Sequence, residues 1–205
     1  MFLTCLDLEG VLIPEIWINL AVKTGIEELN LTTRDIPDYD ELMNHRIGIC
    51  RKNQIRIDDI HEVVKNMNPL EGAVDFLSWL KEGSEVVILS DTFREFAQPM
   101  ISQLNHPTLF CHNIQIDSDR QISGYQLRLQ DQKRHAVRSF INLNFKVTAV
   151  GDSYNDLTML EEADHAVLFR PPDQLIKEKP EYPRVKTHEE LKKHLQNVFS
   201  SMIES

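Results

Sequence analysis

Short apolar runs recur along the chain, and each is followed at once by polar or acidic residues. The runs are "FLTCL", "EVVIL", "KVTAV" and "HAVLF". Near-continuous Val, Ile and Leu predict strands that are buried on both faces, as in parallel sheets. Helix-period segments such as "EGAVDFLSWLKEG" lie between the runs. Strands that alternate with helices predict an α/β fold with a doubly wound parallel sheet.

Two stretches interrupt this alternation. Residues 15–68 lack a buried-strand pattern, and "EIWINLAVKTG" and "DDIHEVVKNM" carry apolar residues at helical spacing, with Asp58 as a candidate helix cap. We therefore expect a small helical cap at 15–68, inserted after the first strand, and a body formed by 1–14 and 69–205. The second stretch, "NIQIDSDRQISGYQLRL", alternates apolar and polar residues around a turn and predicts a hairpin.

Composition and charge narrow the class of protein. The 205 residues are 41% hydrophobic and 26% charged, and 32 acidic against 22 basic residues give a net charge of −10. This balance leaves no cationic footprint for nucleic acid or an anionic membrane. No apolar run approaches the roughly 20 residues of a membrane-spanning helix, and acidic residues interrupt the N-terminus before a secretory signal forms. The spacing of Cys5, Cys50 and Cys111 favours reduced thiols in a cytoplasmic protein.

Carboxylates and a hydroxyl follow three of the predicted strands. Asp7 and Glu9 follow the first, Ser90 follows the second, and Asp152 follows a later one. Ligands of such sheets bind beyond the carboxyl ends of the strands, so we expect these groups at one edge. Asp7 and Asp152 are hard oxygen ligands of the kind that Mg2+ takes, and a cation would offset their repulsion. The eight histidines show no paired ligand spacing, which weakens the case for zinc.

Acids crowded around a cation favour phosphoryl transfer. Asp7 can act as a nucleophile towards phosphorus and form an aspartyl-phosphate. Glu9 can protonate the leaving oxygen and then activate the attacking water. Ser90 can donate a hydrogen bond to the phosphoryl group, and Lys133, in "QDQKRHA", can supply positive charge. Taken singly, these residues could be helix caps or solvated side chains, so it is their combination that favours catalysis.

Four motifs carry a resemblance to a known family. In order they are "DLEGV", "VVILSDT", "QDQK" and "GDSYND", and they span residues 7–156. Together they resemble the haloacid dehalogenase (HAD) superfamily of phosphohydrolases, which implies a Rossmann-like core. The resemblance implies that Asp7 is the nucleophile, Glu9 the general acid/base and Lys133 a catalytic cation. It also implies that Asp7, Asp152 and the main-chain carbonyl of Glu9 bind Mg2+, with Asp156 orienting the site.

Within that superfamily the chain is more similar to phosphoserine phosphatases, whose small helical cap follows the first motif. Glu15 and Arg46 stand where that family contacts the ammonium and carboxylate of the substrate, and Asn155 matches its substrate-contacting Asn. The resemblance also implies that Ser90 and Lys133 contact the substrate. A closing cap would exclude bulk water from the reaction.

Three departures from the usual pattern point to a subgroup. Glu9 stands where most relatives have Asp, Asp91 follows the motif serine where they have glycine, and Glu15 lies one residue closer to the nucleophile. With "DLEGVLIPEIW" and "SDTF", these features are similar to bifunctional phosphoserine phosphatase/homoserine phosphotransferases. The residues do not decide between water and homoserine as acceptor. Asp91 is a substrate contact, a residue that supports the substrate-contacting groups, or only a cap for the helix from Phe93.

Simpler interpretations remain for several residues. Glu15 can favour a helix N-terminus through its charge alone. Arg34, Arg51 and Arg56 compete with Arg46 for the role of substrate contact. The histidines His45 and His112 have no assignable partner in the sequence, and we expect them to be structural.

The leading interpretation is an Mg2+-dependent phosphohydrolase or phosphotransferase that acts on phosphoserine. A HAD phosphatase for another small phosphorylated metabolite is the alternative, and it would leave Glu15 and Arg46 without a role. A non-catalytic phosphoamino-acid-binding module would have no need of Glu9. A signalling receiver module carries its phosphoacceptor on a central strand well into the chain, whereas Asp7 follows the first strand. Exposed cap surfaces can form a homodimer.

Overall fold

The computed structural model describes residues 1–32, 35–36 and 38–204. Within this described part, seven strands form one sheet in the order β4-β3-β2-β1-β5-β6-β7. The strands are β1 (Phe2–Leu6), β2 (Glu85–Phe93), β3 (Thr108–Ile116), β4 (Ile122–Gln126), β5 (Lys146–Gly151), β6 (His165–Phe169) and β7 (Arg184–Val185). The helices are α1 (Ile16–Thr24), η1 (Glu27–Asn30), α2 (Tyr39–Lys52), α3 (Ile57–Asn66), α4 (Ala73–Gly83), α5 (Arg94–Gln103), α6 (Gln132–Asn142), η2 (Tyr154–Asp156), α7 (Leu157–Glu162), α8 (Asp173–Glu178) and α9 (His188–Glu204).

The first strand lies at the centre of the sheet. Leu6 of β1 pairs with Ile88 of β2 on one side and with Val150 of β5 on the other, both in parallel. The chain runs outward from β1 through β2 and β3, then returns to form β5 and β6 on the opposite side. Strand order therefore reverses beside β1, where ligands bind in doubly wound sheets. The predicted fold class is confirmed.

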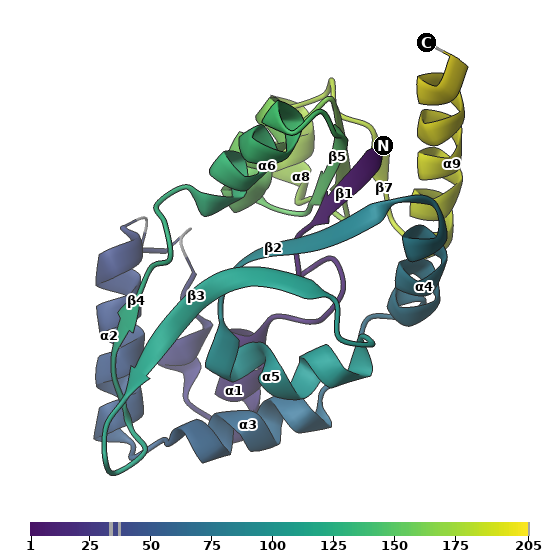
Figure 1. Ribbon diagram of the computed structural model, residues 1–205. Coiled ribbons are helices and arrows are strands. Elements are labelled where there is room, and N and C mark those ends of the chain that lie inside the picture. The colour runs from purple at the N-terminus through teal and green to yellow at the C-terminus, as the bar shows by residue number, and fades with distance from the viewer. Residues whose placement is uncertain (33–34, 37, 205) are drawn as a thin grey trace.

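Helices cover both faces of the sheet because successive strand residues point in opposite directions. Cys5 and Val87 pack in an apolar cluster with α6 and α7, whereas Leu6 and Ile88 pack in a second cluster with α1, α3, α4, α5 and α9. Figure 1 shows α6 and α8 on the opposite side of the sheet from α1 and α5. None of the described helices is both long and apolar enough to cross a bilayer.

The segment between β1 and β2 is helical, as its pattern predicts. Helix α1 ends before Gly25, whose φ of 71° is the left-handed conformation of a helix C-cap. Helix α3 begins at Ile57, so the expected cap at Asp58 is wrong. Instead the Asp59 carboxylate, one residue further inside the first turn, accepts a hydrogen bond from the backbone N–H of Arg56 at 2.7 Å. Because Asp58 and Asp59 are adjacent, the sequence alone does not show which of them bonds to the backbone at the start of the helix.

The apolar core continues from these helices into the rest of the molecule. Leu20 of α1, Met43 of α2 and Ile60 of α3 belong to the same buried cluster as Phe96 of α5. The division into a cap at 15–68 and a body at 1–14 and 69–205 therefore stays a prediction, since the two share one core.

The predicted hairpin is confirmed as β3 and β4, which pair antiparallel through Ile114 and Tyr125. Its turn lies against the helical segment, and Arg120 pairs with Asp58 of α3. Tyr125 donates a hydrogen bond to Asp40 of α2. Helix α2 accordingly runs beside β4 in Figure 1. Strand β7 and helix α8 have no counterpart among the predicted elements.

Candidate active site

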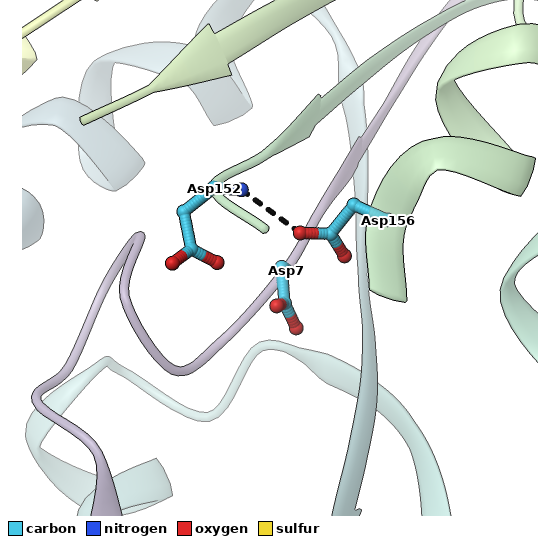
Figure 2. A group of neighbouring side chains, drawn as sticks. All are labelled: Asp7, Asp152 and Asp156. Atoms are coloured by element: carbon cyan, nitrogen blue, oxygen red, sulfur yellow. Dashed lines mark hydrogen bonds between the residues drawn. The ribbon is translucent and has the colours of Figure 1, made fainter. Parts of the chain in front are cut away.

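Three carboxylates meet where the order of strands reverses. Asp7 follows β1, Asp152 follows β5, and Asp156 ends the short η2 turn. One oxygen from each lies within 4.8 Å of the others, and Figure 2 shows the three side chains grouped around the ends of the two strands. The two aspartates expected to share a cation therefore lie together.

Asp156 supports this group from inside the protein. Its fully buried carboxylate accepts hydrogen bonds from the backbone N–H groups of Asp152 and Ser153, at 2.8 and 3.1 Å, through Oδ2. Oδ1 accepts one from Lys133 Nζ at 2.7 Å, and the same ammonium lies 3.0 Å from Asp7 Oδ1. Because both Asp156 oxygens are engaged within the protein, it orients the other groups, and Asp7 and Asp152 remain available to a cation.

The electrostatics of the cluster favour a bound cation. Burial, followed by the nearby charge of Asp156, raises the pKa of Asp7 well above its usual value, although Lys133 opposes the shift. The same two causes raise the pKa of Asp152 to about 7. A divalent cation between the two carboxylates would stabilise their charged forms. Their hard oxygens are ligands that suit Mg2+.

A glycine lets the loop after β1 approach this cluster. Gly10 adopts a φ of 80°, and a Cβ at this position would collide with the carboxylate of Asp152. Only glycine takes this conformation readily and leaves the space. The "DLEG" sequence therefore has a steric reason to end in glycine.

Glu9 and Glu15 both lie at the start of α1. Glu9 Oε2 accepts a hydrogen bond from the backbone N–H of Ile16 at 2.8 Å, so Glu9 binds the helix N-terminus. Glu15 occupies the N-cap position but its side chain makes no capping hydrogen bond. Glu15 is exposed at the cavity mouth, yet desolvation of its carboxyl group, followed by the charge of Glu9, raises its pKa to about 8. Glu15 therefore stands at the helix N-terminus, as the simpler interpretation has it, and also lines the cavity.

The end of β2 supplies Ser90 and Asp91. Ser90 is buried, and its Oγ accepts a hydrogen bond from the backbone N–H of Thr92 at 3.2 Å. Asp91 does not cap α5, whose N-cap residue is Phe93. Burial raises the pKa of Asp91, but the charge of Lys133 and hydrogen bonds from neighbouring side chains outweigh it and lower that pKa to about 2. Asp91 is therefore a fixed negative charge.

Arg46 reaches the site from α2. Its guanidinium lies 4.7 Å from the ring centre of Trp17, and Nη2 donates a hydrogen bond to the carbonyl of Leu31 at 2.8 Å. Only 9% of the residue is exposed, and Nε has no acceptor in the part of the chain that the structure describes. Of the competing arginines, Arg51 and Arg56 are exposed. The third, Arg34, lies outside the described residues.

One cavity of about 420 Å³ unites these side chains. Its lining includes every residue expected for the site except Asp156, which lies behind it: Asp7, Glu9, Glu15, Arg46, Ser90, Asp91, Lys133, Asp152 and Asn155. Tyr39 also lines the cavity, and its hydroxyl donates to the carbonyl of Asp91 at 3.3 Å, although no sequence pattern marks it as a site residue. The sequence also offers no sign that His112, expected to be structural, and Gln132 lie against Asp91.

A family model of haloacid dehalogenase-like hydrolases matches residues 5–164 of the chain. The chain belongs to this family. All the residues that line the cavity fall within this matched range.

Individual members of the haloacid dehalogenase-like hydrolases extend the likeness over nearly the whole chain. Phosphoserine phosphatase ThrH of Pseudomonas aeruginosa is 54% identical over 193 residues, which cover 94% of each chain. A phosphoserine phosphatase of Pseudomonas syringae pv. tomato is 54% identical over 93% of this chain and 81% of its own. The crystal structure of phosphoserine phosphatase from T. onnurineus has the same fold, with a TM-score of 0.75, 23% identity and coverage of 96% and 94%.

Proposed function

We propose that the protein is an Mg2+-dependent phosphoserine phosphatase that works through an aspartyl-phosphate on Asp7. The observation that carries the substrate assignment is the guanidinium of Arg46, a buried group whose Nε has no acceptor among the described residues. A buried polar group without a partner is costly, and a bound carboxylate would remove that cost through a charge-assisted hydrogen bond. The names of the two Pseudomonas relatives support phosphoserine as the substrate.

The acidic side of the cavity fits the other end of an amino acid. Glu15 and Arg46, an acid and a base, line the same cavity. Crowding against Glu9 contributes to the raised pKa of Glu15, and a substrate ammonium beside it would stabilise the charged form. A zwitterion with a phosphate group matches this arrangement.

Asp7, Asp152 and the main-chain carbonyl of Glu9 are the groups that would hold Mg2+ in this proposal. When bound, Mg2+ would neutralise part of the charge on the phosphoryl oxygens. Lys133 and Ser90 would hold the same oxygens, and Asn155 would contact the substrate. Asp156 keeps Lys133 in place through its 2.7 Å hydrogen bond.

The proposed reaction has two steps at Asp7. An oxygen of its carboxylate attacks phosphorus, the bond from phosphorus to the serine oxygen breaks, and Glu9 gives that oxygen a proton. Glu9 then takes a proton from water, which attacks the aspartyl-phosphate and releases inorganic phosphate. The 2.8 Å hydrogen bond from Ile16 fixes one Glu9 oxygen, which leaves the other to carry the proton.

A substrate panel tests the assignment. We expect kcat/KM for phosphoserine to exceed that for phosphoethanolamine, which lacks the carboxylate, by about 10²-fold. Sugar phosphates and nucleotides should be turned over still more slowly. Comparable rates for all of them would favour a phosphatase for another metabolite. Binding of phosphoserine without turnover would favour a non-catalytic binding module.

We propose homoserine as a second acceptor, on the strength of the sequence resemblance. Homoserine carries the same ammonium and carboxylate as serine, so Glu15 and Arg46 could hold it while its hydroxyl attacks the aspartyl-phosphate in place of water. Phosphorus NMR of the products distinguishes the two acceptors. O-phosphohomoserine should appear when homoserine is added, and free phosphate alone would indicate a plain phosphatase.

We further propose that residues 15–68 act as a cap over a body formed by 1–14 and 69–205. The placement of Glu15 and Arg46 opposite the strand ends supports this division. A cytoplasmic location is in keeping with the three cysteines, which are free and buried. A homodimer remains a proposal that light scattering on the purified protein would test.

A further inference from the structure

Two buried polar side chains lie behind the cavity wall and have no part in the proposed chemistry, although one of them, Gln132, belongs to the "QDQK" motif. His112 is in β3 and is 3% exposed, and Gln132 begins α6 and is 1% exposed. Both lie against Asp91, which follows Ser90 at the end of β2. Buried polar groups of this kind are held by specific partners, so their hydrogen bonds reveal what they do.

The hydrogen bonds fix the orientation of both side chains. The backbone N–H of Arg128 donates to His112 Nδ1 at 3.1 Å, so Nε2 carries the ring hydrogen. The Arg128 guanidinium donates to Gln132 Oε1 through Nε and Nη2, at 3.1 and 2.9 Å. The amide nitrogen of Gln132 must therefore face the other way, where it donates to the carbonyl of Ser90 at 2.6 Å.

Two donors consequently converge on one oxygen of Asp91. Gln132 Nε2 donates to Asp91 Oδ1 at 3.2 Å, and His112 Nε2 lies 3.4 Å from the same oxygen. The other oxygen, Oδ2, lies 3.8 Å from Lys133 Nζ. One third of the Asp91 side chain is exposed, and the residue lines the cavity. The carboxylate is thus held at one end while its other end faces the catalytic lysine.

An acid at this position requires such restraint. This chain carries Asp91 directly after Ser90, at the mouth of a cavity that would bind a phosphate. A carboxylate that swung towards the phosphoryl group would repel it strongly, because like charges interact strongly in a site with little water. It would also compete with phosphate for the ammonium of Lys133.

We propose that His112 and Gln132 are positioning residues that hold the Asp91 carboxylate away from the bound phosphoryl group. This inference rests on the proposed function only in that the cavity binds a phosphate ester. It assigns a role to two residues that the proposed chemistry does not use. It also explains how the carboxylate of Asp91 is held in position.

Substitutions at position 112 test the proposal in the Mg2+-loaded protein. His112→Leu removes both ring nitrogens, whereas His112→Gln keeps one donor and one acceptor. We expect the Leu variant to raise KM for phosphoserine and Ki for inorganic phosphate about 10-fold, with kcat changed less than about 3-fold. The Gln variant should stay within about 3-fold of the parent protein in all three. If the Leu variant fails to fold, Gln132→Met tests the same restraint.

A double substitution separates restraint from simple damage to the fold. Asparagine at position 91 carries no charge to restrain, so adding Asp91→Asn to His112→Leu should restore most of the lost phosphate affinity. An equal loss from His112→Leu with and without Asp91→Asn would overturn the proposal, as would an unchanged Ki. If the parent protein hydrolyses no phosphate ester, the proposed function fails, and calorimetry with inorganic phosphate still decides the role of His112.

Discussion

The two walls of the cavity differ in how completely their polar groups are paired. On the wall made by strand ends, Lys133 bonds to Asp156 at 2.7 Å and lies 3.0 Å from Asp7. On the wall made by helices, Arg46 leaves Nε without an acceptor in the described part of the chain, and Glu15 makes no capping bond. The polar groups of the first wall are paired within the protein before any ligand binds. On the second wall, we expect a bound ligand to supply the missing partners.

This difference matches the two tasks of a phosphatase. Groups that stabilise developing charge work best when they are already in place, since they then need no reorganisation during the reaction. Groups that select a substrate discriminate best when the substrate supplies a hydrogen-bond partner that they otherwise lack. An analogue without that partner leaves the buried protein group unpaired and therefore binds more weakly. We therefore expect the strand wall to control the rate and the helical wall to control the choice of substrate.

The largest expected effect is at the nucleophile. Asp7→Asn should lower kcat by about 10³-fold or more, because the amide cannot form the acyl-phosphate. Turnover of phosphoserine and mass spectrometry of the trapped protein measure this loss. The parent protein should gain the mass of one phosphoryl group, and the variant should gain none. A folded variant that keeps its activity would exclude the covalent mechanism.

A second prediction concerns whether the two walls fold together. Leu20 of α1 is fully buried in the cluster that also contains Phe96, so Leu20→Ala should lower the free energy of unfolding by about 3 kcal/mol. Unfolding should remain a single transition, because the walls share one core. Val22 of the same helix is 76% exposed and provides the control, since Val22→Ala should change little. Two separate transitions would show that the helical wall folds on its own.

The third prediction concerns substrate choice. Arg46→Met should lower kcat/KM for phosphoserine about 10²-fold, through the lost carboxylate contact. The rate for phosphoethanolamine should change only a few-fold, because that substrate has no carboxylate to lose. Arg51 lies on the same helix and is half-exposed, so Arg51→Met is the matched control and should change neither rate substantially. Equal losses for both substrates in Arg46→Met would show that the arginine does not read the carboxylate.

The same contrast between the two walls explains which site residues could be predicted from the sequence. Buried strands are visible in the sequence as apolar runs, and in a parallel sheet the carboxyl ends of such strands lie at one edge. Asp7, Ser90 and Asp152 could therefore be predicted to lie together at that edge from the sequence alone. The helical wall has no such rule. Glu15 and Arg46 could be named only through the resemblance, and Tyr39 could not be named at all.

Other features could not be predicted from the sequence because they depend on contacts between segments that are distant along the chain. His112 lies in β3, 21 residues beyond Asp91 in sequence, and only the register of β2 against β3 brings the two together, as the pairing of Phe93 with His112 shows. The two residues of β7 form a strand only because Val185 pairs with Phe169 at the sheet edge. Neither a short segment nor a single histidine carries enough pattern to predict such contacts.

The smallest expected effect is a pH dependence that belongs to the strand wall. The carboxyl of Asp152 has a pKa of about 7 in the folded chain, whereas an unfolded chain titrates it near its usual value of 3.8. Between these values the folded state binds more protons than the unfolded state. Its contribution to stability is therefore lost as pH rises from about 4 to 7, when no metal is present.

Magnesium should reverse this trend, because it binds the ionised carboxylate. We expect the rise in Tm on adding Mg2+ to be close to zero near about pH 5 and to grow to a few degrees by about pH 8. Thermal unfolding in EDTA and in Mg2+ across this range measures it, and Asp152→Asn should remove both the slope and the response. A response to Mg2+ that is the same at every pH, or that persists in Asp152→Asn, would place the cation elsewhere. Glu15 also has a raised pKa, to which the charge of Asp152 contributes, so Glu15→Gln shows how much of the slope belongs to that group. The response to Mg2+ should persist in this variant, because Glu15 is not one of the proposed ligands.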